Sequence, residues 1–489
     1  MSEFFEANRE GSDIGKKALR SGSIALVARF VGAAIQLVTT MVLARLLMPN
    51  DYGLVAIITA LTSFAPMLID LGLTESTVQK PKITAAQVSS LFWISIGVAC
   101  LMALILVAAS PILASLYHQP ALAGIASASG ITLVIYSLSL QHGALLRRAL
   151  RFKDIAAIEI SGALCGAGVA IAMAVFEFGF WALVVRGITT ALIITLGSWL
   201  RCNWKPGRPK LDTEVKSMLR FGLRMSFGTI ATISSNSADR VIMGFMHSPA
   251  TIGIYQNAFV LYGNALEAIT QPLGKVGTST LTKLRGDHAQ FLMKYLTALS
   301  SVSFFSMPAF AILAVIAKDL VPLLLGDKWI QSGIILSIFA LRGIVHVIET
   351  SQTWLHIPLG RPERWGKWAI LTACVQVAAI AAGLPFDAIG VAISIVLVRS
   401  ILAIPSVLYA GRPLDLRFRN LVQTVGRQFL GAIVVLVIGN LVLNYLPTEM
   451  SRISRIATVI GSCISTYLIL VVGMLGLKDP LRLAYSIIK

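Results

Sequence analysis

Residues 44–58 read ARLLMPNDYGLVAII, and residues 244–258 read GFMHSPATIGIYQNA. Each stretch places a proline and, four residues later, a glycine between two long apolar runs. At a constant offset of 200 positions the pairs are Gly22/Gly222, Pro49/Pro249 and Gly53/Gly253. Proline lacks a backbone N–H and therefore interrupts a helix that would otherwise continue. The same bend occurring twice predicts an internal duplication of the chain.

The composition of the chain points to a lipid environment. Its 489 residues are 56% hydrophobic and only 13% charged, with a mean hydropathy of +0.79. Soluble domains carry about 25% charged residues. The apolar runs approach the roughly 20 residues that a helix needs to cross ~30 Å of hydrocarbon, where only internal hydrogen bonding satisfies the backbone. We therefore predict an all-α polytopic membrane protein with about fourteen spans at 21–45, 53–75, 88–112, 121–142, 155–176, 179–200, 219–244, 252–274, 292–316, 331–356, 367–384, 386–409, 428–446 and 456–476.

The distribution of positive charge predicts the orientation. A net charge of +18 would suggest nucleic acid as the partner of a soluble protein, but here most Lys and Arg residues lie on the side of the N-terminus. The opposite side has only Arg45, Lys318, Lys328, Arg452 and Arg455. Because positive loops stay inside, both termini are expected in the cytosol, with no nucleic acid as a partner.

The spacing of the two bends predicts the domain organisation. Six predicted spans separate each bend from its copy, an even number, so both copies point the same way through the membrane. Parallel repeats of this kind are a known transporter plan with the substrate path between the halves. We expect two pseudo-symmetric six-helix lobes followed by two C-terminal helices. The expected division is a cytosolic basic leader at 1–20, an N-lobe at 21–213, a C-lobe at 214–410 and an extension at 411–489.

Two polar stripes occupy corresponding spans of the two lobes. Positions i, i+3, i+7 and i+11 share one helix face. In the first span they hold Arg29, Gly32, Gln36 and Thr40, and in the seventh span they hold Thr229, Thr232, Asn236 and Arg240. Arginine suits a phosphate path because its planar fork holds two oxygens and stays charged. Asp239 and Arg240 are adjacent, about 100° apart on a helix, so we do not expect them to pair.

Further polar residues inside the spans complete the expected site. The predicted cleft lining consists of Arg29, Gln36, Thr40, Asp70, Thr232, Asn236, Arg240, Asn264, Glu267 and Gln271. Span ten adds a stripe that is either a second anion contact or a coupling site, formed by Arg342, His346 and Glu349. Charged residues within spans also pair simply with one another. The roles of Arg186 and Arg399, either ties between helices or part of the path, stay open.

No signature of catalysis or of a cofactor is present in the sequence. There is no P-loop, no G-x-S-x-G and no H-E-x-x-H, and the five cysteines form no C-x-x-C pair. We expect neither an enzyme nor a metal site. Coupling to H⁺ or Na⁺ stays open, with Asp70, Glu267, His346 and Glu349 as the candidate carboxylates and imidazole.

Several motifs together resemble a known family. They are ARLL at the end of the first span, the turn P-x-D-Y-G, DLGL at 70–73 and LRRALRFK at 146–153. With fourteen spans in two related halves, the chain resembles the polysaccharide-transport branch of the multidrug/oligosaccharidyl-lipid/polysaccharide exporter superfamily. It looks most like the flippases for colanic acid and similar exopolysaccharide or O-antigen units, over essentially its whole length.

This resemblance implies a substrate and a location. The substrate is an oligosaccharide repeat unit on undecaprenyl pyrophosphate, moved by alternating access from the cytosolic to the periplasmic leaflet of the bacterial inner membrane. Implied partners are the lipid bilayer and the polysaccharide polymerase and co-polymerase. The alternatives within the superfamily are a cation-coupled multidrug exporter and a lipid II flippase. A membrane polymerase or ligase is disfavoured because the loops on the outer side are short.

Overall fold

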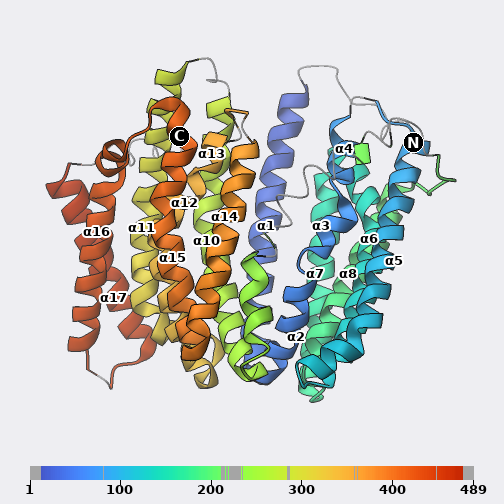
Figure 1. The fold of residues 1–489 in the computed structure, drawn as a ribbon, viewed down its shortest axis with the longest axis horizontal. Helices are drawn as coiled ribbons and strands as arrows, with labels where there is room; N and C mark the ends of the chain where they lie inside the picture. The colour runs from blue at the N-terminus through green and yellow to red at the C-terminus, as the bar shows by residue number, and fades with distance from the viewer. Residues whose placement is uncertain are drawn as a thin grey trace. The chain divides into compact units, whose positions relative to one another are not determined.

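The structure is a computed structural model that describes residues 13–80, 82–210, 215, 218–219, 233, 235–282, 287–356, 358–360, 362–447 and 449–476. Side chains are described within these ranges except at 13–26, 270–282 and 362. In the described part every regular element is a helix, so the predicted all-α class is confirmed. The chain divides into two compact units, 1–253 and 254–489, which are drawn in Figure 1.

The described part of the first unit contains the helices α1 to α8. They are α1 Asp13–Leu46, α2 Pro49–Thr62, α3 Ala65–Asp70, α4 Leu73–Gln79, α5 Ala85–Leu116, α6 Ala121–Arg148, α7 Phe152–Val175 and α8 Trp181–Cys202. The second predicted span is broken into α2, α3 and α4. The break between α3 and α4 arises because Leu71 and Gly72 both have positive φ, which a helix does not continue through. Helix α5 begins cleanly because the Thr84 hydroxyl accepts the Gln87 N–H at 3.2 Å.

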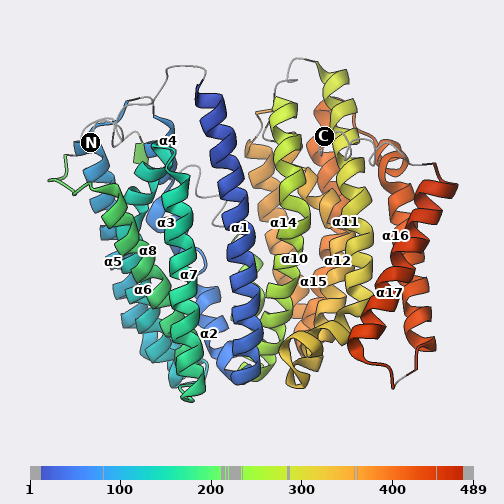
Figure 2. The same ribbon diagram turned by 180° about the vertical axis from the view of Figure 1, so that it is seen from behind.

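Within this unit the long helices pack in pairs. Helix α5 packs on α6, α7 on α8 and α6 on α8, while α1 packs along α7. Both ribbon views show α5 to α8 side by side (Figures 1 and 2). At one end of this bundle, Leu91, Phe92, Leu145 and Trp204 are buried in a shared apolar cluster. This packing thus fixes the positions of α6, α7 and α8 relative to one another.

The second unit contains the remaining described helices. Helix α10, Pro249–Thr282, begins in the first unit and continues into the second. It is followed by α11 His288–Leu325, α12 Ile330–Ser351, α13 Thr353–His356, α14 Pro362–Gly383, α15 Asp387–Gly411, α16 Phe418–Tyr445 and α17 Arg452–Tyr467. Short 3₁₀ turns lie at Asp327–Trp329, Leu384–Phe386 and Arg412–Leu414, and a π-helical segment at Leu468–Met474 ends the described chain.

Helix α11 is the centre of the second unit. It packs on α12, α16 and α17, while α15 packs on α12 and α14. The Tyr467 hydroxyl donates to the Phe304 carbonyl at 2.9 Å and so fastens α17 to α11. The last two helices therefore lie against the outside of this bundle, where Figure 2 shows them in red.

The long helices are those of a multi-span membrane protein. Eleven ranges are long and apolar enough to cross a membrane, and one of them, Glu363–Leu414, contains both α14 and α15. Large apolar side chains are exposed on these helices, for example Phe30 and Leu200 at 72% and 76%. Every predicted span except 219–244 is covered by one or more described helices, with 53–75 divided among three. Most of that range lies outside the described residues, so the count of fourteen stays a prediction.

The two copies of the proline and glycine bend contact each other within the first unit. Pro49 is the first residue of α2 and Pro249 is the first residue of α10. A Cβ on Gly53 would overlap the carbonyl of Pro249, and a Cβ on Gly253 would overlap the carbonyl of Pro49. The backbone N of Gly53 also lies 2.9 Å from the place where a Gly253 Cβ would be. This reciprocal contact is what a pseudo-symmetric duplication produces.

Candidate substrate path

The exposed stripe of α1 meets an arginine of α8. The Arg186 guanidinium donates to the Gln36 side-chain oxygen at 2.5 Å. The Thr40 hydroxyl is buried and donates to the backbone carbonyl of Gln36 at 2.8 Å, so it supports the helix. Arg29 is exposed about two turns further along α1. Gln36 and Arg29 thus share an exposed face of α1. Arg186, on α8, contacts Gln36 of this face.

Arg240 is held by its own helix, contrary to expectation. Its Nε lies 3.1 Å from the Asp239 carboxylate, and its terminal nitrogen donates to the Asn236 carbonyl at 2.6 Å. Asp239 and Arg240 are both buried. The prediction that adjacent residues would not pair was wrong because the long arginine stem folds back along the backbone. Thr232 lies outside the described residues, so this stripe is seen only from Asn236 onward.

Asp70 has a local structural contact. Its carboxylate accepts the backbone N–H of Thr74 at 3.0 Å and also the Thr74 hydroxyl. The contact bridges the break between α3 and α4, where Leu71 and Gly72 turn the chain. Asp70 is half-buried and interacts electrostatically with Tyr136 of α6. It therefore fixes the bend and also lies near the inner face of α6.

Helix α10 carries an exposed polar pair. Asn264 and Glu267 are both exposed and lie three residues apart, so they are neighbours on one face. The side chain of Gln271, the next predicted member of this stripe, lies outside the described ones. Carboxylate and amide groups on an exposed face are suited to hydrogen bonds with hydroxyl-rich ligands.

The polar stripe of α12 forms a buried ion cluster with α15. Both oxygens of the Glu349 carboxylate are used, one at 3.1 Å from Arg342 and the other at 3.1 Å from Arg399. The ring of His346 lies 3.5 Å from the same carboxylate. The sequence had left the role of Arg399 open; its location in the middle of an apolar run was the signal that it needed a partner.

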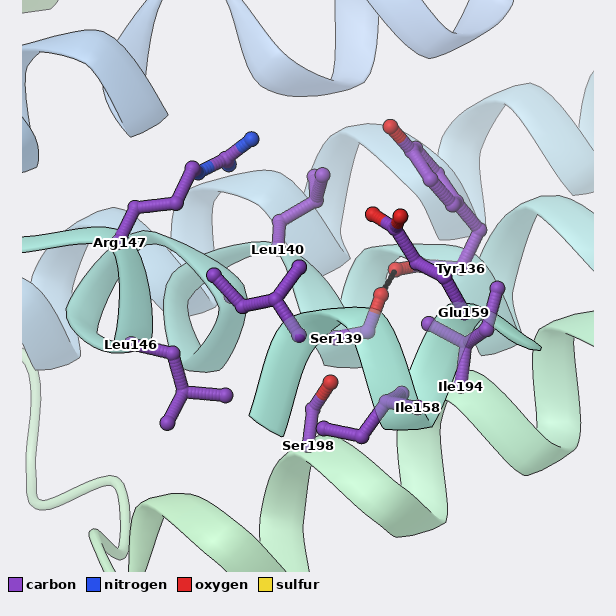
Figure 3. A pocket seen from close by; sticks show the side chains of 11 residues that line it. Tyr136, Ser139, Leu140, Leu146, Arg147, Ile158, Glu159, Ile194 and Ser198 are labelled. Carbon is purple, nitrogen blue, oxygen red and sulfur yellow. Dashed lines mark hydrogen bonds between the residues drawn. The ribbon is translucent and has the colours of Figure 1, made fainter. Parts of the chain in front are cut away.

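A cavity of about 220 Å³ lies between α6, α7 and α8 (Figure 3). Arg147 lies at one end of it and Tyr136 and Glu159 lie at the other, with Leu140 between them. The hydroxyls of Ser139 and Ser198 also line it. None of these five polar residues was in the predicted site. A glutamate within a predicted span was the signal that could have identified it.

The described residues offer no metal site, since no group of three or more His, Cys, Asp or Glu side chains converges in that part of the chain. What the polar side chains offer instead is hydrogen bonding and charge. Arginine side chains are suited to binding anions, and serine and tyrosine hydroxyls are suited to hydrogen bonds with the hydroxyls of a ligand.

Solved structures with the same fold clarify the class of protein. The structure superposes on "Lipid II flippase MurJ, inward closed conformation" with a TM-score of 0.71, covering 91% of this chain and 98% of that one at 15% identity. It superposes on an inward-facing "multidrug resistance MATE family transporter of the MOP superfamily" with a TM-score of 0.58, covering 80% and 98% at 13% identity. At such low identity these likenesses show the fold alone. The chain therefore shares the multi-helix fold of these two proteins.

The sequence itself identifies the family. A family profile described as "Polysaccharide biosynthesis protein" matches residues 42–333. The chain belongs to this polysaccharide biosynthesis family, which confirms the resemblance read from its motifs.

Individual relatives agree with the family. The chain is 24% identical to the "Uncharacterized membrane protein in cps region" of Klebsiella pneumoniae over 63% of its own length. That match spans 64% of the Klebsiella protein, just under two thirds. The chain is 22% identical to "Lipopolysaccharide biosynthesis protein WzxC" of Escherichia coli (strain K12) over 79% of each chain. "Succinoglycan biosynthesis transport protein ExoT" of Rhizobium meliloti (strain 1021) is 24% identical over 71% of each chain.

Proposed function

We propose that this protein is a flippase that moves undecaprenyl-pyrophosphate-linked oligosaccharide repeat units from the cytosolic to the periplasmic leaflet for exopolysaccharide or O-antigen assembly. Family membership supports the class of substrate, and one structural observation supports the mechanism. Arg29 and Gln36 present an arginine and an amide on an exposed face at the depth of the spans, and the half-buried Arg186 donates a hydrogen bond to Gln36. Charged groups at that depth are costly unless they face water or a substrate.

The physical problem that such a protein solves is desolvation. A pyrophosphate and its sugars cannot enter hydrocarbon bare, because transferring a charge out of water costs many kcal/mol. We propose that guanidinium and amide groups replace this water while the polyprenyl tail stays in the bilayer. The proposed lining comprises Arg29, Gln36, Thr40, Asp70, Thr232, Asn236, Arg240, Asn264, Glu267 and Gln271, with Arg186 added because it contacts Gln36.

The roles of these residues differ in kind. Arg29, Gln36, Asn264 and Glu267 are exposed and are proposed to contact the substrate directly. Thr40 and Asp70 support the backbone of the lining, since Thr40 donates to the Gln36 carbonyl and Asp70 accepts the Thr74 N–H. Arg240 is proposed to exchange its bond to Asp239 for a substrate anion, because both bonds are charge-assisted.

The buried cluster of Arg342, His346 and Glu349 is proposed to serve coupling rather than anion binding. Glu349 already engages Arg342 and Arg399, so both guanidinium groups have an anion. A cluster that joins α12 to α15 is placed to change its pairing when these helices shift. The driving ion in this proposal is H⁺ or Na⁺, with no other cofactor and no catalytic step.

We further propose the cellular setting. The protein lies in the bacterial inner membrane with both termini in the cytosol, as the distribution of Lys and Arg residues predicts. Its partners are the lipid-linked oligosaccharide and the bilayer, and the polymerase and co-polymerase that use the exported unit. The likeness to lipid II and multidrug transporters is one of fold and favours neither alternative.

Arginine substitutions test the proposal. Arg29 and Arg240 are replaced singly by Ala and by Lys in a host deleted for this gene, and surface polysaccharide is measured at matched membrane levels of protein. We expect at least tenfold less polysaccharide from each Ala variant, because an anion contact is lost. The matched control is Arg208→Ala, an exposed arginine beyond α8. Normal export from both Ala variants would remove these arginines from the mechanism.

Loss of Arg240 alone removes the guanidinium that contacts the buried Asp239 carboxylate, which is destabilising in itself. The double variant Asp239→Asn/Arg240→Gln removes both charges and keeps the shapes. We expect it to reach the membrane and still fail to export. If it exports normally, Arg240 serves only to neutralise Asp239.

A further inference from the structure

The cavity between α6, α7 and α8 has opposite charges on its walls that do not meet. Arg147 of α6 and Glu159 of α7 both line it and interact electrostatically. Among the residues that the structure describes, neither side chain forms a hydrogen bond or an ion pair, and the exposed Tyr136 hydroxyl forms no hydrogen bond either. Figure 3 shows the space between the guanidinium at one end and the carboxylate with the phenol at the other.

This cavity must open to water and not to lipid. Glu159 is exposed, although it lies seven residues inside α7, which is roughly 10 Å along the helix. An unpaired carboxylate at such a depth is costly in hydrocarbon, so intramembrane charges face a bundle interior or a water-filled space. The floor is apolar, with Leu140 and Ile158 buried. The result is a recess with an apolar base and a polar rim.

The groups on the rim match the chemistry of an acidic sugar. Carboxylates accept hydrogen bonds from vicinal hydroxyls, and the flat face of a tyrosine packs on the C–H groups of a sugar ring. Arginine binds a phosphate or a carboxylate through two parallel hydrogen bonds. The volume is below the roughly 300–1,000 Å³ of pockets that enclose a drug-sized ligand. It therefore suits one ring of a larger substrate.

We propose that this recess is a subsite for one sugar ring that carries or adjoins a negative charge. Glu159 and Tyr136 hold the ring hydroxyls and Arg147 holds the anionic group, which is either a sugar phosphate or the carboxylate of a uronic acid. The inference rests on the proposed transport of a lipid-linked oligosaccharide and specifies how its head is recognised.

A cation is the other ligand that a carboxylate at this depth could take, and the geometry disfavours it. Glu159 is the only carboxylate among the residues lining the recess. Arg147 shares the same space and would repel a cation. The Ser139 hydroxyl already donates to the Tyr136 carbonyl at 2.7 Å. A hard cation needs several converging oxygen ligands, which these residues do not supply.

Binding of small soluble probes tests the subsite apart from transport. The full-length protein in nanodiscs is mixed with glucose, glucose 1-phosphate, glucuronic acid or inorganic phosphate, and binding is followed by saturation-transfer difference NMR. We expect glucose 1-phosphate or glucuronic acid, or both, to bind at least tenfold more tightly than glucose. Preference for one of them identifies the source of the charge. Binding of phosphate alone, with none of the sugars, would overturn the proposal.

The variants separate the roles within the recess. We expect Arg147→Gln to abolish the preference for the charged sugar over glucose. Glu159→Gln and Tyr136→Phe should weaken sugar binding at least fivefold and leave phosphate binding unchanged. The matched controls are Lys153→Gln and Glu177→Gln, exposed charges outside the recess. Sugar binding that survives Glu159→Gln while Na⁺ or H⁺ dependence of export disappears would show a cation site and sink the subsite.

Export in cells separates this proposal from the broader one. If the Arg29 and Arg240 variants stop export but the probes never bind at the recess, the flippase function stands and the subsite fails. If the probes bind as described but deletion of the gene leaves surface polysaccharide unchanged, the flippase proposal fails while the recess remains a sugar site. Circular dichroism and thermal unfolding confirm that each variant is folded.

Discussion

The carbonyl of Pro249 occupies the place that a side chain on Gly53 would need. The carbonyl of Pro49 does the same at Gly253, so the two bends exclude side chains from each other reciprocally. Backbones approach this closely only where a Cβ is missing. The glycines of the duplicated motif are therefore explained by a contact between its two copies, which no single copy reveals.

Replacing Gly53 or Gly253, the glycines of this crossing between the two bends, should destabilise the protein. We expect Gly53→Ala to lower the free energy of unfolding by about 1–3 kcal/mol, as overpacking does, and Gly253→Ala to do the same. Thermal unfolding in detergent measures this. Export should fall together with stability, because the start of α10 must shift.

Gly32 of α1 is the matched control for these substitutions. A Cβ added there meets nothing within 4 Å. Gly32→Ala should raise helix stability by up to about 1 kcal/mol, since alanine is the better helix former. Equal effects at Gly32 and Gly53 would show that the crossing is looser than described.

The hydrogen bond between Gln36 and Arg186 should show energetic coupling. In a double-mutant cycle of Gln36→Ala and Arg186→Ala, we expect a coupling energy of about 0.5–1.5 kcal/mol, because the bond is charge-assisted but partly exposed. Chemical unfolding in detergent provides the four free energies. Additive losses would mean that the two side chains do not interact in the membrane.

Polysaccharide export by two variants of Arg186, to Ala and to Lys, adds a second measurement. Arg186→Lys keeps the charge but lacks the planar fork, so it should export less than the wild type and more than Arg186→Ala. Full export by both variants would show that Arg186 serves only in helix packing.

Removing the carboxylate of the buried cluster should strongly destabilise the protein. Glu349→Gln removes the carboxylate that both Arg342 and Arg399 contact, and we expect a loss of about 3–5 kcal/mol in the free energy of unfolding. Protein level in the membrane and thermal unfolding measure it. The exposed pair of Asp327 and Arg452, 2.7 Å apart, is the matched control. Asp327→Asn should change stability by less than about 1 kcal/mol.

Replacing the whole cluster distinguishes structure from coupling. The triple variant Arg342→Met/Glu349→Leu/Arg399→Met removes the three charges of this cluster and should recover most of the lost stability. If the cluster couples transport to an ion, this folded variant exports little polysaccharide. Normal export from it would show that the ions serve packing alone.

Tyr117 fastens the loop after α5 to the segment before α10. Its hydroxyl donates to the Val241 carbonyl at 3.2 Å, and its ring stacks on Phe245 with the centroids 4.5 Å apart. Tyr117→Phe should cost about 1 kcal/mol of unfolding free energy, because one hydrogen bond is lost and the stacking is kept. Tyr445→Phe, at a residue 87% exposed, should cost nothing measurable.

The contribution of Tyr117 to the free energy of unfolding should depend on pH only in the alkaline range. Burial raises the pKa of the Tyr117 phenol to about 12, above the value of about 10 for a free tyrosine. The neutral form is thus favoured in the folded state, and its stabilisation is complete below pH ~10 and is lost as the pH rises toward 12. Unfolding curves of wild type and Tyr117→Phe should therefore differ by a constant amount at neutral pH. A gap that changes between mildly acidic and neutral pH would contradict this.

Much of the fold was predictable because its signals are local. Apolar length and the positions of Pro49 and Pro249 identified helices, breaks and a duplication without any partner being known. The predicted site was less complete, since helical periodicity shows which residues share a face but not which helix they meet. It selected Gln36 but left open its partner Arg186, 150 positions away. It grouped Arg342 with Glu349 and left the role of Arg399 open.

The sequence by itself determined that this chain lives in a membrane, which stretches of it form long apolar helices, and which family it belongs to. Hydropathy and backbone chemistry act within one helix, so they can be read along the chain. Only the tertiary structure decided which charges neutralise one another, that the two glycines face each other's prolines, and that Arg147 and Glu159 line one recess without touching. Those outcomes depend on the packing of helices distant in sequence, where a shift of a few ångströms decides whether two charges form a pair or a binding site.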